Sequence, residues 1–186
     1  MKTMQKFISI VFPILLLIPF TGFGQKTESP DSVNQNLISA AREIMNAAGT
    51  CALITLDEEG RPRVRAMDPF APETDFTVWF GTNSKSRKVD QISRDPRVTL
   101  YYLDRDASGY VMIHGNAQLV DDQKEKEKHW KDQWEAFYPN KSEDYLLIKV
   151  SPIWLEVSSS PRGIIGDTLT WQPPALLFDS NQPPID

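Results

Sequence analysis

Short runs of alternating apolar and polar residues, separated by turn formers, recur along this chain and are typical of half-buried β-strands. The clearest pair is residues 50–56 and 61–67, joined by a turn in which Gly60 can adopt a left-handed conformation. Further strands are predicted at residues 75–81, 97–103, 110–120, 145–150, 153–158 and 168–171. This pattern predicts a mainly β fold, an antiparallel β-barrel that is closed or partly closed, rather than a parallel sheet.

Three helices are predicted around these strands. The first follows apolar residues at helical spacing from Leu37 to Ala48, and Gly49 is placed to end it. The second covers residues 84–93 and the third residues 122–138. The third carries one apolar stripe, formed by Trp130, Trp134, Phe137 and Tyr138. We interpret this stripe as core or dimer packing.

The N-terminus reads as a secretory signal. Two lysines precede an apolar run at residues 7–20, and Gly22 and Gly24 suit a cleavage before Gln25. The run is shorter than the roughly 20 residues of a membrane span, although an uncleaved anchor is the alternative. We expect a signal peptide at 1–24, a disordered terminus at 25–33, one domain at 34–178 and a tail at 179–186.

Charge and composition exclude several classes of protein. The formal net charge is −5 and becomes −7 once the signal peptide and its two lysines are removed, which argues against nucleic-acid binding. The two histidines and single cysteine show no metal-ligand spacing, and Cys51 lies in an apolar strand as a structural thiol. No motif of a nucleophilic or nucleotide-dependent enzyme is present either, which favours a protein whose cofactor brings the chemistry.

The run GTNSKSRK, residues 81–88, predicts an anion site. A strand enters a polar turn here, and the turn opens a helix with Ser86, Arg87 and Lys88 in its first turn. Helix N-terminal N–H groups, the Thr82 and Ser86 hydroxyls and the two cations suit a phosphate monoester.

The same run resembles the YTNxxSRK segment of the pyridoxamine 5′-phosphate oxidase-like, FMN-binding split-barrel flavoproteins. The resemblance extends from about Ile38 to about Phe178 through GRPRVRAM, RDPRVTLYYLD, HGNAQLVDD and GDTLTWQPPALLF, and is greatest to the general stress protein branch. It implies a Greek-key split barrel, an FMN cofactor and a homodimer with the flavin at the two-fold interface. Deazaflavin and haem are the alternative cofactors that the family allows.

The resemblance also implies roles for individual residues. Thr82, Ser86, Arg87 and Lys88 would hold the FMN phosphate, and Arg63 and Arg65 would reach the phosphate or the ring edge. The ring would be lined by Met67, Trp79 and Phe80, with backbone N–H groups from Phe80 through Gly81 to Thr82 at its polar edge. Tyr110 stands where the oxidases present a glutamine to the partner subunit's flavin.

One departure from the vitamin B6 oxidases concerns the substrate. Where they carry an Arg-Leu-His-Asp segment, this chain reads VSSSPRGI at residues 157–164, so pyridoxamine phosphate oxidase activity is not expected. We therefore expect an exported FMN-dependent oxidoreductase that passes electrons to a small acceptor. The alternative is a flavin-binding or haem-binding carrier, or a stress-related sensor, that does not turn over.

Overall fold

The structure, a computed structural model, describes residues 30–178. The predicted signal peptide and C-terminal tail lie outside the described residues. The strands are β1 (Cys51–Leu56), β2 (Pro62–Met67), β3 (Val78–Asn83), β4 (Arg97–Leu103), β5 (Gly109–Val120), β6 (Tyr145–Ser159) and β7 (Ala175–Leu177). The helices are α1 (Pro30–Ala48), α2 (Arg87–Arg94), α3 (Gln123–Lys128) and α4 (Lys141–Asp144), with the 3₁₀ turns η1 (Asp132–Phe137) and η2 (Ser160–Arg162).

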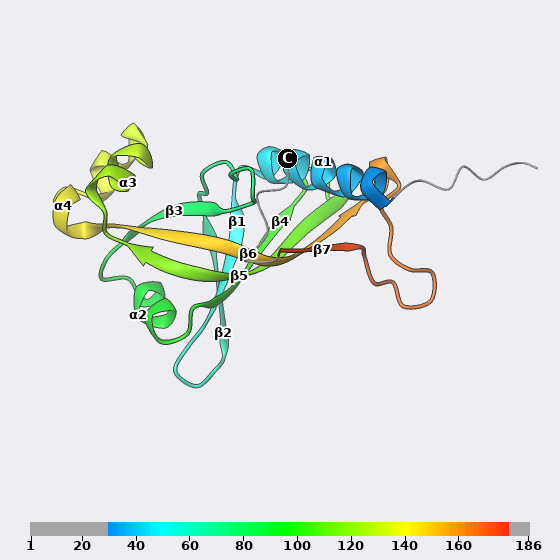
Figure 1. The fold of residues 1–186 in the computed structure, drawn as a ribbon. Coiled ribbons are helices and arrows are strands. Elements are labelled where there is room, and N and C mark those ends of the chain that lie inside the picture. The colour runs from blue at the N-terminus through cyan, green and yellow to red at the C-terminus, as the bar shows by residue number, and fades with distance from the viewer. Residues whose placement is uncertain (1–29, 179–186) are drawn as a thin grey trace, which may run out of the picture.

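All seven strands form one antiparallel sheet, in the order β2-β1-β4-β5-β6-β3, with β7 also paired to β6. The long strand β6 explains this branching: its first half pairs with β3 and its second half with β7. The register of β5 against β6 shifts between His114 and Gly115. Ile153 of β6 has no partner in β5 at this point, and the resulting bulge lets the two long strands bend as they cross the molecule (Figure 1).

The two ends of the sheet approach each other beyond β2. Pro69, just after β2, forms an isolated bridge with Phe80 of β3, and the Phe70 N–H donates to the Trp79 carbonyl at 2.9 Å. These contacts connect the last strand of the sheet back to the segment that follows the first. The predicted fold class, a mainly antiparallel β-barrel with flanking helices, is confirmed.

Helix α1 covers one face of the sheet, where it packs on β4, β5, β6 and β7 (Figure 1). Its buried side is formed by Leu37, Ile38, Ala40, Ala41, Ile44 and Met45. The helix ends at Ala48, and Gly49 follows with a φ of 71°, as its place in the sequence predicted. It begins at Pro30, four residues before the predicted start of the domain. Helix α2 packs on β1 and β5.

The predicted helix at residues 122–138 is wrong: the chain forms α3 and then η1. Asp122 caps α3, where its side chain accepts a hydrogen bond from the Glu125 N–H. The helix stops because His129 and Trp130, which are adjacent, both pack into an aromatic cluster. A continuous helix would turn them about 100° apart. Phe137, predicted to be part of the stripe, is instead 71% exposed.

Three strand predictions also change. Strand β3 begins at Val78 rather than Asp75, because the Asp75 carboxylate binds Thr77 and Phe76 takes a φ of 63°. The two strands predicted between residues 145 and 158 are one strand, β6. The strand predicted at 168–171 is a turn held by the Asp167 side chain, and the last strand is β7.

Candidate anion-binding site

The N-terminus of α2 faces outward with free donors. The turn before it is fixed by Asn83, whose side chain accepts from the Lys85 N–H at 2.8 Å and whose carbonyl accepts from the Ser86 N–H. Ser86 occupies the N-cap position, but its side chain makes no cap hydrogen bond. Since the first N–H groups of a helix have no partner within it, those of Arg87 and Lys88 remain available to a ligand.

The side chains around this N-terminus are linked to one another. The Lys88 ammonium donates to the Thr82 hydroxyl at 3.0 Å, and the Thr82 and Ser86 hydroxyl oxygens lie 3.2 Å apart. Thr82 is buried, and it comes from the end of β3, directly before the turn. The three polar groups predicted from the sequence therefore lie in one place.

Arg65 of β2 is held beside this group by neutral oxygens. Its Nη1 donates to the Thr55 hydroxyl at 2.7 Å and its Nη2 to Gln91 Oε1 at 2.9 Å. The Thr55 hydroxyl in turn donates to the same Gln91 oxygen at 2.6 Å. This triad joins β1, β2 and α2, so the guanidinium is fixed by three separate elements.

The three cations of this site influence one another. Burial lowers the pKa of Arg65, and the positive charge of Arg87 lowers it further. Burial and the charge of Arg65 likewise lower the pKa of Lys88. Within residues 30–178, none of the three forms an ion pair with a carboxylate. The site therefore concentrates positive charge that the described part of the chain leaves unneutralised.

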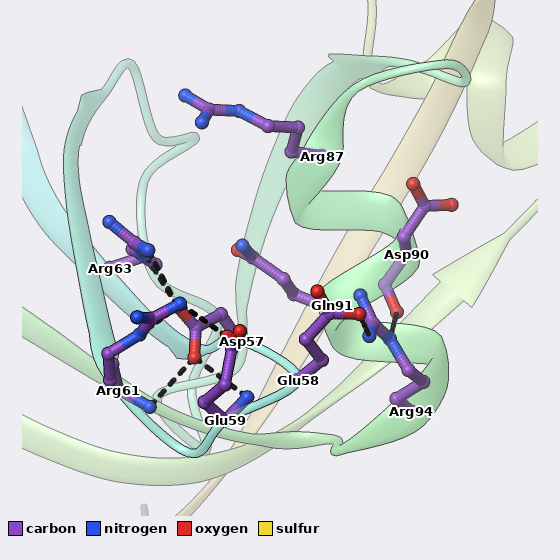
Figure 2. Close-up of a pocket in the computed structure, with 9 residues that line it drawn as sticks. All are labelled: Asp57, Glu58, Glu59, Arg61, Arg63, Arg87, Asp90, Gln91 and Arg94. Atoms are coloured by element: carbon purple, nitrogen blue, oxygen red, sulfur yellow. Dashed lines mark hydrogen bonds and ion pairs between the residues drawn. The ribbon is translucent and has the colours of Figure 1, made fainter.

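A second group of arginines lies next to it, between the β1–β2 hairpin and α2 (Figure 2). Arg63 and Arg61 both pair with Asp57, and Arg94 of α2 pairs with Glu58. These residues surround a hollow of about 190 Å³, lined by Asp57, Glu58, Glu59, Arg61, Arg63, Arg87, Asp90, Gln91 and Arg94. Arg63, predicted as a cofactor ligand, is thus bound to a carboxylate of its own hairpin, while Arg87 extends over the same hollow.

Two of the residues predicted to line the flavin ring, Trp79 and Phe80, lie on opposite faces of β3. Phe80 is fully buried in the main core, whereas Trp79 points the other way and stacks on His129 with ring centroids 4.3 Å apart. Gly81 shares the face of Trp79: a Cβ there would lie 2.5 Å from the Trp134 ring. Its lack of a side chain is therefore explained by packing. Met67 lies at the edge of the core, partly buried.

Tyr110 lies at the other end of β5 from the cation group. It pairs with Leu103 and Ser158 in the sheet, stacks on Tyr101, and donates a hydrogen bond from its hydroxyl to Glu156 at 2.6 Å. Burial, with the Glu156 carboxylate beside it, raises the pKa of Tyr110 to about 12. Within one chain Tyr110 does not reach Arg65 or the N-terminus of α2.

Thr55 and Gln91 were missed from the sequence. Two signals for them exist. Thr55 is a polar residue on the inward face of a strand whose other inward residues are Cys51 and Leu53, and Gln91 follows Arg87 by four residues, on the same side of the helix. The buried residues of α2 are Gln91 and Ile92.

Other sites receive no support from the described residues. Among residues 30–178, no three histidine, cysteine or acidic side chains are grouped to hold a metal ion. No helix in that part of the chain is long and apolar enough to cross a membrane. Cys51 is buried, and burial raises its pKa to about 12, so it is a structural thiol.

A mainly antiparallel barrel with a cationic helix N-terminus at its edge is the class of protein that this fold and site define. Residues 37–165 match the family described as pyridoxamine 5′-phosphate oxidase like, and the chain belongs to that family. A dihydrophenazinedicarboxylate synthase of Pseudomonas chlororaphis is 30% identical over 112 residues. That match covers 59% of this chain and 49% of the synthase, so the chain spans about half of that relative's length.

Solved structures share the fold. A protein from Clostridium acetobutylicum related to general stress protein 26 superimposes with a TM-score of 0.63 at 19% identity, covering 77% of this chain and 95% of the other. A heme binding protein from Mycobacterium smegmatis superimposes with a TM-score of 0.58 at 12% identity, covering 76% of this chain and 57% of the other. At these identities the likeness concerns the fold alone.

Proposed function

We propose that this protein binds FMN, with the cofactor's phosphate held by Arg65, Arg87 and Lys88 and by the hydroxyls of Thr82 and Ser86. The observation that carries the proposal is a set of three cations without a carboxylate partner among residues 30–178, beside unpaired helix N–H groups. A phosphate monoester carries about −1.5 to −2 charges near neutral pH and several acceptor oxygens. It therefore fits both the charge and the donors of the site.

We further propose that the protein is an oxidoreductase. FMN, when bound, supplies electron and hydride transfer through its ring, and the protein supplies binding and orientation. The electrons would pass from a reductant through the flavin to a small acceptor. Pyridoxamine phosphate is not the expected reductant, since residues 157–164 lack the segment that grips it in the vitamin B6 oxidases.

A second copy of the chain is proposed to complete the site. The sheet face that points away from the α1-facing core is largely apolar. In register across it lie Val64, Ile54, Thr99, His114, Trp154 and Leu177. Val64 is 66% and Leu177 79% exposed in one chain, so a partner would remove apolar surface from water. Tyr110 lies on this face too, which supports its predicted contact with the partner's flavin.

The dimer is tested at an exposed position, where folding is not at risk. Val64→Glu should convert the dimer to a monomer in analytical ultracentrifugation, because a charge would be buried at the apolar interface. Leu169→Glu is the matched control, since Leu169 is 89% exposed in the 168–171 turn. A wild-type protein that sediments as a monomer at high concentration would refute the dimer.

The phosphate site is tested with two flavins that differ only in phosphate. In the double variant Arg87→Ala with Lys88→Ala, the affinity for FMN should fall by about a hundredfold or more, because charge-assisted hydrogen bonds are lost. The affinity for riboflavin, which has no phosphate, should hardly change. Flavin fluorescence titration measures both, and an equal loss for the two flavins would refute the assignment.

The absorption spectrum of the purified mature protein separates this proposal from its alternatives. Flavin bands that bleach with NAD(P)H support the oxidoreductase, and flavin bands that only a chemical reductant such as dithionite bleaches support a carrier. A Soret band would show that the cofactor is haem and not FMN.

We also propose that residues 1–24 direct export. N-terminal sequencing of protein from the extracytoplasmic fraction tests this, and a chain still beginning at Met1 would contradict cleavage.

A further inference from the structure

Gln91 is a buried polar residue at the boundary between the hairpin and the proposed phosphate site. Only 6% of it is exposed, and it lies beside Ile92 on the side of α2 that packs into the molecule. Its Oε1 accepts two hydrogen bonds, from Arg65 and from Thr55. Thr55 is itself 1% exposed. Burying two polar side chains is costly unless each is bonded, and here the bonds they make converge on the Arg65 guanidinium.

The direction of the protons in this triad is determined. Arg65 can only donate, so Thr55 Oγ1 accepts from its Nη1 at 2.7 Å. The single hydroxyl hydrogen of Thr55 is then directed to Gln91 Oε1, which also accepts from Nη2 of Arg65. Each acceptor is therefore used, and the guanidinium is held at two of its nitrogens by oxygens that carry no charge.

The lack of charge on these acceptors matters for a ligand. A carboxylate at position 91 would hold Arg65 equally well, but it would pair with the guanidinium and repel an incoming phosphate. Asp57 pairs in this way with Arg63, which lies two residues before Arg65 on β2. We propose that Gln91 and Thr55 are positioning residues that orient Arg65 toward the cofactor phosphate while leaving its positive charge unneutralised. This inference rests on the proposed FMN site.

The nearly isosteric variant Gln91→Glu tests it. The ion pair with Arg65 should keep the melting temperature at or above that of the wild type, so a loss of binding cannot be ascribed to misfolding. The affinity for FMN, and for inorganic phosphate measured by calorimetry, should fall about tenfold or more, on the scale of one hydrogen bond to a charged group. The affinity for riboflavin should stay within about twofold.

Thr55 supplies the second comparison. Thr55→Val keeps the shape but removes the hydroxyl, and it should lower the preference for FMN over riboflavin. Thr55→Ser restores the hydroxyl and should restore that preference, which a role in packing alone does not predict. If Gln91→Glu and Thr55→Val both keep the wild-type preference, the positioning role is wrong and the FMN site stands. If the wild type binds FMN and riboflavin equally and does not bind phosphate, both proposals fail.

Discussion

Two neighbouring groups of cations in this protein are treated in opposite ways. The hairpin group, in which every cation is paired with a carboxylate, consists of Arg61, Arg63 and Arg94. The site group consists of Arg65, Arg87 and Lys88, none of which pairs with a carboxylate among residues 30–178. Arg65 and Lys88 donate hydrogen bonds to neutral oxygens, and the charge of Arg87 acts on Arg65. The hairpin group surrounds the hollow between the β1–β2 hairpin and α2, and Arg87 of the site group lines the same hollow (Figure 2).

The paired cations stabilise the fold, whereas the unpaired cations are available to bind an anion. Exposed ion pairs such as Arg94 with Glu58 stabilise a fold by about 0–1 kcal/mol, and they leave no charge available to a ligand. Unpaired cations in a partly buried site do the reverse: they cost stability in the free protein, and an anion that binds recovers it. Sequence position alone does not distinguish the groups, because Arg63 and Arg65 are two residues apart and lie on the same face of β2.

The largest effect is expected from truncating each of these two arginines in turn. Arg65→Ala should lower the affinity for FMN relative to riboflavin by about ten- to a hundredfold, since hydrogen bonds to charged groups are worth about 1.5–3 kcal/mol. Arg63→Ala should change this ratio by less than about threefold, because Asp57 already occupies that guanidinium. Flavin titrations of the two variants measure the contrast. Equal losses would support the sequence-based prediction that both arginines hold the cofactor.

An intermediate effect is expected at Asp57, where the hairpin group can be disrupted. Its burial alone would raise the pKa, but hydrogen bonds from the backbone and side chain of Arg61, and from Arg63, hold the pKa of Asp57 well below its usual value of 3.8. Asp57→Asn should lower the melting temperature near neutral pH by a few degrees. The preference for FMN over riboflavin should stay within about twofold.

The pH dependence of this variant follows from the direction of the shift. Because the folded pKa of Asp57 is depressed, its contribution is present above pH 3.8 and is lost as the pH falls below that value. The difference in melting temperature between the wild type and Asp57→Asn should therefore shrink in strong acid. A difference that stays constant down to pH 2 would show that the turn geometry, and not the charge, is responsible.

Local patterns in the sequence predicted the fold where local contacts decide it. Strand β4 has the predicted bounds, and Gly60 forms the hairpin turn with a φ of 75°. The prediction failed where distant residues decide, as at His129. Its ring stacks on Trp79 and meets Phe70 edge to face, and both of these residues come from another part of the chain.

The candidate site divides in the same way. Thr82, Ser86 and Lys88 lie within seven residues of sequence, so one turn brings them together and the pattern revealed them. The Arg65 triad could not be predicted, because Thr55 and Gln91 are 36 residues apart and meet only after β1 and α2 pack together. Likewise, nothing in the sequence of the hairpin indicates that Asp57 binds Arg63 but not Arg65.

The smallest effect is a gain in stability from removing a site cation. Lys88→Met should raise the free energy of unfolding of the cofactor-free protein by about 0.5–1 kcal/mol, since it removes a partly buried charge. The melting temperature should rise slightly as a result. The lowered pKa of Lys88 gives a second signature. Between that pKa and 10.5 the unfolded chain binds more protons, so the wild type gains stability with rising pH relative to the variant. Inorganic phosphate should stabilise the wild type more than the variant, as differential scanning calorimetry can measure. A variant that melts below the wild type without phosphate would show that Lys88 supports the fold, as the hairpin arginines do.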